Sequence, residues 1–202
     1  MSQQLAVVIG SDKTSFSVKS IDIPKPEVDE ILVKVLAAAQ NPIDCECNCC
    51  YRNLSLINLT VKSVELGFLD EGCVPGCDYA GMVEEVGSNV KGVKKGDRVL
   101  PVSSGINTLI LIRMSTQVAG FHSYGTFAQF VRVDGKNFFR IPEEVSFDNA
   151  ASYGIAFQTA TLGLYHTLNL PEPYTARDEE ATPILVWGGA SMCLTIFWGD
   201  IF

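Results

Sequence analysis

Small residues that follow an apolar run near residue 190 have the pattern of a phosphate-binding turn. The run is Pro183–Trp187, and the turn consists of Gly188, Gly189, Ala190 and Ser191. Small side chains after a strand let backbone N–H groups approach a pyrophosphate, which the N-terminus of a following helix then stabilises. The pattern therefore indicates dinucleotide binding, although an ordinary turn at the end of a strand has the same composition.

Seven cysteines raise the question of a metal site, because four of them crowd into one short segment. Structural zinc prefers cysteine pairs two to four residues apart, with a second pair further along the chain. The C-x-C-x-C-C spacing lacks that arrangement, so we predict free thiols in a reducing compartment and no bound metal, with zinc as the alternative. The four cysteines are Cys45, Cys47, Cys49 and Cys50.

Length and charge limit the classes of function. The 202 residues suffice for one full domain and part of a second, and their 47% apolar content can fill a core. The net charge of −8, without a basic stripe, excludes nucleic acid as a partner. The N-terminus lacks the basic region of a signal peptide, and the longest apolar stretch is too short to span a bilayer. We therefore expect a cytoplasmic protein without a membrane partner.

Two kinds of periodicity divide the chain. From Ser146 the apolar residues recur at helical spacing, with Ser146 as the expected N-cap and Pro171 as the stop. Before that point, short β-rich runs separated by Gly, Pro, Asp and Asn turns predict a barrel-like, mainly β domain. The predicted strands are Leu5–Ile9, Phe16–Ile21, Ile31–Ala38, Met82–Val86, Arg98–Val102, Phe127–Val133 and Phe138–Ile141.

Several segments together resemble the medium-chain dehydrogenase/reductase superfamily. Asn41-Pro42-Ile43-Asp44 resembles the "NPxD" of its zinc-free quinone and enoyl reductase branches, and the segment from Pro75 to Gly87 resembles "PGxDxAGxVxxVG". In this order and spacing, the motifs are specific over most of residues 3–191. The most similar branch is that of the fungal trans-acting enoyl reductases and their quinone reductase relatives. The other matching segments are Asp29–Val35, Gly96–Val99, Gly125–Phe130, Ile141–Ala151 and Ile184–Ser191.

The resemblance implies a GroES-like domain over residues 1–145, followed over residues 146–202 by a linking helix and the truncated start of a Rossmann domain. NADPH would be the cofactor, and an enone, enoyl thioester or quinone would accept the hydride. A polyketide synthase is a candidate partner. Asn41 would lie near the nicotinamide ribose and Thr159 would meet the nicotinamide, whereas the simpler interpretations are an Asn-Pro turn and a packed helical threonine.

Zinc-dependent members of the superfamily carry a histidine in a "GHE" turn, where this chain has Gly76-Cys77-Asp78. A zinc site would need Cys45, Cys77 and Asp78 to approach one another. Without zinc, alcohol oxidation lacks a Lewis acid, so the resemblance favours reduction of a conjugated double bond. The candidate proton donors are Tyr51, Tyr79 and Tyr124.

Three segments depart from the family pattern: residues 45–62, residues 100–117 and the chain after Ser191. Unspliced introns or an error in the gene model would explain them, and so would genuine lineage-specific loops for the first two. Two functional classes remain open. One is an NADPH-dependent enoyl or quinone reductase that is inactive as the literal 202-residue chain. The other is a non-catalytic GroES-like binding module or a mis-spliced fragment.

Overall fold

The computed structural model describes residues 2–12, 15–41, 44, 71–101, 125–171, 185 and 191. Residues 45–62 lie outside this part of the chain, and of residues 100–117 only the first two are described. The strands are β1 (Gln3–Ile9), β2 (Phe16–Asp22), β3 (Glu30–Ala39), β4 (Asp78–Val86), β5 (Arg98–Pro101), β6 (Phe130–Asp134) and β7 (Phe138–Arg140). The helices are α3 (Phe147–Ala151), α4 (Gly154–Thr161) and the π-helix η3 (Leu162–Thr167).

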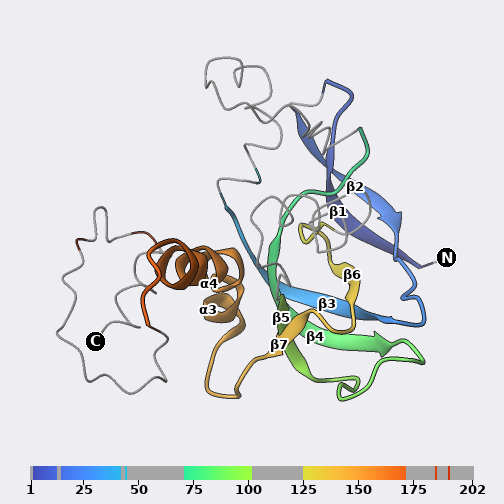
Figure 1. Ribbon diagram of the computed structural model, residues 1–202. Coiled ribbons are helices and arrows are strands. Elements are labelled where there is room, and N and C mark those ends of the chain that lie inside the picture. Colours follow the sequence, from blue (N-terminus) through green and yellow to red (C-terminus); the bar gives the residue numbers. More distant parts are fainter. Residues whose placement is uncertain are drawn as a thin grey trace.

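The strands form two antiparallel sheets (Figure 1). β1 pairs with β2, and a second sheet has the order β6-β3-β4-β5-β7. An isolated bridge joins Ala6 of β1 to Ala128, which lies just before β6. Each of the seven predicted strands is present, which confirms the mainly β domain. The largest differences in bounds are at β4, which begins four residues earlier than predicted, and at β6, which begins three residues later.

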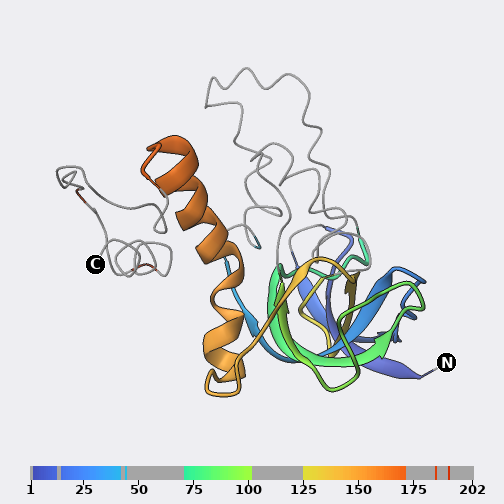
Figure 2. The same ribbon diagram turned by 60° about the horizontal axis from the view of Figure 1, so that its bottom comes forward.

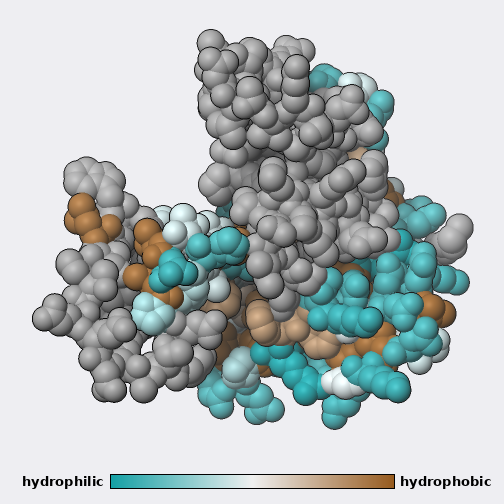
Figure 3. All heavy atoms as spheres, in the orientation of Figure 1, coloured by the Kyte–Doolittle hydropathy of each residue, from teal (hydrophilic) through white to brown (hydrophobic). Residues whose placement is uncertain are grey.

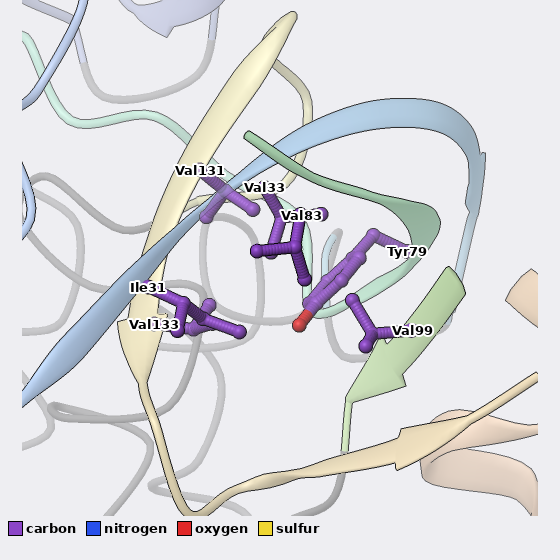
Figure 4. Close-up of a cluster of buried hydrophobic side chains, with 7 residues drawn as sticks. All are labelled: Ile31, Val33, Tyr79, Val83, Val99, Val131 and Val133. Carbon is purple, nitrogen blue, oxygen red and sulfur yellow. The ribbon is translucent and has the colours of Figure 1, made fainter. Parts of the chain in front are cut away.

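Alternation of side chains along the strands builds the main core (Figure 4). Branched apolar residues point to the same face of the five-stranded sheet, as a half-buried strand requires. Fully burying a side chain of this kind contributes roughly 1.5–3 kcal/mol. The Tyr79 ring extends into the cluster, and its hydroxyl lies among valines. The cluster consists of Ile31, Val33, Tyr79, Val83, Val99, Val131 and Val133.

Irregular pairing of β3 with β4 sets the position of the residues that follow β3. The register shifts between Leu32 and Val33 and again between Val35 and Ala37. Such irregularities bend a strand and redirect its side chains. Gly81 lies opposite the second shift, where an added Cβ would stand 2.2 Å from the backbone oxygen of Lys34. The strands can therefore approach there only with glycine, and β3 continues until Ala39 pairs with Asp78 at the start of β4.

The helices follow one another along one side of the β domain (Figure 2). α3 packs on β3 and β4, where Ala150 and Ala151 are buried against Ala80 and Ile141. Ser146 caps α3 by accepting a hydrogen bond from the Asn149 amide, as predicted. The predicted continuous helix is interrupted at residues 152–153, and its last turns are a π-helix that ends at Thr167.

Arg98 fastens the loop that leads into the helices. Its guanidinium donates hydrogen bonds to the backbone oxygens of Pro142 (3.0 Å), Glu143 (2.9 Å) and Val145. The same group lies over the Phe147 ring, 4.4 Å from its centroid. On the face shown in Figure 3, hydrophilic side chains cover much of the described β domain, with apolar patches between them. None of the described helices is long and apolar enough to cross a membrane.

Candidate active site

Asn41 and Asp78 meet where β3 ends and β4 begins. The Asn41 side-chain nitrogen Nδ2 donates a 2.9 Å hydrogen bond to Asp78 Oδ2. The Asn41 backbone N–H donates at 2.7 Å to Asp44 Oδ2, which closes a turn after the strand. The residue is therefore held by two carboxylates, one through its side chain and one through its backbone. Asn41 itself is half-buried, whereas Asp44 and Asp78 are buried.

The start of α4 completes this cluster. The backbone N–H of Ile155 donates to both carboxylate oxygens of Asp78, at 2.9 Å to Oδ1 and 3.1 Å to Oδ2. The first N–H groups of a helix have no partner inside it, and an acidic side chain is a favourable partner for them. Asp78 thus joins the end of β3 to the beginning of α4.

Burial governs the acidity of both carboxyl groups. Asp78 is 1% exposed, and burial raises its pKa from 3.8 to about 6, although the hydrogen bonds from Asn41 and Ile155 oppose the rise. The nearby charge of Asp44 adds to it. Burial also raises the pKa of Asp44, while hydrogen bonds from the Asn41 backbone and the Cys77 side chain oppose that change. Two acidic groups with raised pKa values in one place are typical of functional sites.

The other residues singled out in the sequence are placed only in part. Thr159 lies on α4, one turn beyond Ile155, and is exposed. No hydrogen bond joins it to Asn41 or Asp78 within the described residues. Ser191 is exposed, and Gly188, Gly189 and Ala190 lie outside the described part of the chain. The structure therefore brings Asn41 to the start of α4 and does not test the glycine turn.

The structure describes only some of the candidate proton donors and metal ligands. Tyr79 is fully buried in the core and burial raises its pKa, so its hydroxyl cannot reach a substrate. Tyr51, Tyr124 and Cys45 lie outside the described residues. Cys77 contacts Asp44, while the Asp78 oxygens accept from Asn41 and Ile155. Across the described ranges, no three His, Cys, Asp or Glu side chains are arranged to hold a metal ion.

The orientation of the Asn41 amide suits a hydroxyl donor such as the ribose of a nicotinamide cofactor. A carboxylate only accepts hydrogen bonds, so the amide must turn its nitrogen toward Asp78 and its carbonyl oxygen away. Within the described part of the chain that oxygen accepts no hydrogen bond. Asn41 therefore fits the group that the resemblance places there.

Asp44 and Gly154 belong to this cluster although the sequence did not mark them as site residues, and Asp78 was considered there only as a possible zinc ligand. The signal for Asp78 is an acidic residue at the first position of a buried strand, two residues after Pro75-Gly76. A separate open depression, with a volume of about 350 Å³, lies between β1, β2, β3 and residues 126–129. Its lining is mostly apolar and includes neither Asn41 nor Asp78, so it is not part of the candidate active site.

Comparison with known proteins shows the family to which the chain is similar. The alcohol dehydrogenase GroES-like domain family matches residues 27–143, which is more than half of the chain. A trans-enoyl reductase, TOXD of Cochliobolus carbonum, is 36% identical over 197 residues, covering 97% of this chain and 57% of that protein. The chain spans about half the length of the curated relatives it matches.

Solved structures share the fold. An alcohol dehydrogenase superfamily protein from Novosphingobium aromaticivorans superimposes with a TM-score of 0.71 at 20% identity, over 96% of this chain and 48% of that one. The quinone oxidoreductase from Coxiella burnetii has a TM-score of 0.59 at 23% identity, over 85% of this chain and 47% of that one. This chain therefore belongs to the alcohol dehydrogenase GroES-like domain family, within the medium-chain dehydrogenase/reductase superfamily.

Proposed function

We propose that this chain is the substrate-side part of an NADPH-dependent reductase that acts on an enoyl thioester or a quinone-type conjugated substrate. The observation that carries the proposal is the fixed amide of Asn41, which presents a carbonyl oxygen beside the start of α4. The trans-enoyl reductases among the relatives support the choice of substrate class. A polyketide synthase is the proposed source of an enoyl thioester.

In this proposal, residues 1–145 form the GroES-like domain and residues 146–202 lead into a nucleotide-binding domain. A bound nicotinamide cofactor supplies the hydride, and the protein supplies position and electrostatics. Asn41 accepts a hydrogen bond from a ribose hydroxyl. Thr159, on α4, lies toward the nicotinamide. Gly188, Gly189, Ala190 and Ser191 offer their backbone N–H groups to the pyrophosphate.

The 202-residue chain alone should bind NADPH weakly and show no turnover. A Rossmann site requires several parallel strands around the glycine turn. In this sequence, Ile184–Trp187 has the composition of one such strand. Calorimetric titration of the expressed chain with NADPH measures this directly. A dissociation constant in the low micromolar range would mean that another chain completes the site.

A chimeric protein tests the activity itself. Residues 1–171 of this chain would be joined to the part of the Cochliobolus carbonum relative that follows its match to residue 171. We expect the chimera to consume NADPH in the presence of a crotonyl thioester or a quinone, and to lose most activity when Asn41 is changed to Ala. Efficient zinc-dependent oxidation of simple alcohols would contradict the proposal. Binding of a protein partner without any turnover would favour a non-catalytic GroES-like module.

A further inference from the structure

Within the part of the chain that the structure describes, the buried carboxylate of Asp78 has no cationic partner. Among the described residues, neither Asp78 nor Asp44 forms an ion pair with Lys or Arg. Burying a charged group without an opposite charge destabilises a fold. Residues that lower stability in this way are expected mainly at functional sites. The contacts of Asp78 therefore call for an explanation beyond packing.

Those contacts determine which way the Asn41 amide faces. The oxygen and nitrogen of an amide have similar size, so the hydrogen-bonding partners decide its orientation. The ionised carboxylate of Asp78 accepts hydrogen bonds and cannot donate them. Its Oδ2 lies 2.9 Å from Asn41 Nδ2. A hydrogen bond to a charged group is about twice as strong as one between neutral groups. The carboxylate therefore selects the orientation with the carbonyl oxygen turned away from Asp78.

Gly154 allows the carboxylate to stand close to α4. An added Cβ at this position would lie 2.0 Å from Asp78 Oδ1 and 2.7 Å from Asp78 Cγ. Alanine is a better helix former than glycine, so helix propensity does not explain a glycine as the first residue of α4. The close approach of Asp78 does explain it.

We propose that Asp78 is a positioning residue, whose carboxylate, held by the start of α4, fixes the Asn41 amide with its oxygen toward the cofactor ribose. The inference rests on the proposed function for the identity of the ligand. The orientation itself depends only on Asn41, Asp78 and Gly154. Asp78 acts through Asn41 and does not contact the reacting atoms.

The amide can be observed in the 202-residue chain without any cofactor. Nitrogen-15 labelling of asparagine side chains gives one pair of amide protons for Asn41, assigned by its loss in Asn41→Ala. Slow hydrogen exchange of this pair is expected in the unmodified chain. Asp78→Asn and Gly154→Ala should both speed the exchange at least tenfold, the first by removing the charge and the second by displacing the carboxylate.

Thr126→Val is the matched control. Thr126 is fully buried, and its hydroxyl donates a 3.0 Å hydrogen bond to the backbone oxygen of the same Asp78. The substitution removes a buried hydrogen bond beside the site without touching the carboxylate. It should lower stability and leave the exchange of the Asn41 amide protected. Rapid exchange in the unmodified chain, or continued protection in Asp78→Asn, would overturn the proposal.

Kinetics of the chimera then separate positioning from stability. Asp78→Asn should raise the KM for NADPH on the order of tenfold, the factor expected when one hydrogen bond to a charged group is lost. Thr126→Val should leave that KM unchanged, because loss of folded protein lowers the amount of active enzyme and not its affinity. Equal effects of the two substitutions would reduce Asp78 to a structural role. If the unmodified chimera does not bind NADPH, the proposed function fails, while the exchange experiment still decides the orientation.

Discussion

The side-chain amide of Asn41 donates a hydrogen bond to the buried carboxylate of Asp78, across the open end of the β3–β4 pair. This contact places a chemically usable group, the Asn41 carbonyl oxygen, at the junction between the β domain and α4. Because Asp78 is buried in the fold, its ionisation also affects the stability of the protein.

The stability of the protein should therefore fall as the pH rises from about 4 to about 7, relative to that of Asp78→Asn. The pKa of Asp78 is about 6 in the folded protein and near 3.8 when unfolded, so the folded state binds the extra proton within this range. Stability from such a group is present below the unfolded pKa and is lost as the pH passes the folded one. The raised pKa of Asp44 acts in the same direction.

Urea unfolding at both ends of that range measures the effect. A relative loss on the order of 1–3 kcal/mol is expected for the unmodified chain. Because most proteins with paired carboxylates behave in the opposite way, a relative gain in stability over this range would show that Asp78 is not desolvated.

Replacing Tyr79 with Phe should raise the free energy of unfolding by about 1 kcal/mol. Within the described residues the buried Tyr79 hydroxyl has no hydrogen-bond partner, so it loses its contact with water and gains nothing in return. Tyr153→Phe is the control, because Tyr153 is 43% exposed and its hydroxyl can stay hydrated. Thermal or urea unfolding measures both. Destabilisation by Tyr79→Phe would reveal a partner for the hydroxyl.

Arg98→Lys should lower the free energy of unfolding by about 2 kcal/mol. Arginine bonds several backbone oxygens of the loop before α3 at once, and a lysine ammonium cannot reproduce that planar set of donors. Arg140→Lys provides the comparison, because its side chain is 62% exposed and should change stability by less than about 0.5 kcal/mol. Similar losses from the two substitutions would contradict this role for Arg98.

Purified protein should contain no tightly bound zinc. The Gly76-Cys77-Asp78 turn lacks the histidine of zinc-dependent relatives, and the Asp78 oxygens already accept hydrogen bonds from Asn41 and Ile155. Elemental analysis after mild chelation tests the prediction. About one zinc ion per chain that survives this treatment would assign the protein to a different branch.

Local patterns were sufficient to predict the strands and the helix start. Alternating apolar residues such as Ile31 and Val33 determine a strand and its buried face, and Ser146 has both the type and the position of an N-cap. The family motifs also drew attention to Asn41, which the structure places beside Asp78 and near the start of α4, while its role toward a cofactor stays a prediction. These features depend on residues that are close together in the sequence.

The contact between Asn41 and Asp78 could not be predicted in this way. It depends on two register shifts in the β3–β4 pair, and no local pattern determines their number. Nor did the helical periodicity reveal the break at residues 152–153, which lets Ile155 turn its backbone N–H toward Asp78. The role of Gly154 appears only when the distance from its missing Cβ to Asp78 Oδ1 is known.

Transfer of hydride to the substrate is the most direct test of the reductase proposal. The chimera would be supplied with a crotonyl thioester and with NADPH that carries deuterium at both hydride positions of the nicotinamide ring, and the product would be analysed by mass spectrometry. We predict one deuterium on the β-carbon of the product for each NADPH consumed, with Asn41→Ala slowing the reaction on the order of tenfold. An unlabelled product, or a rate that does not depend on Asn41, would contradict the account.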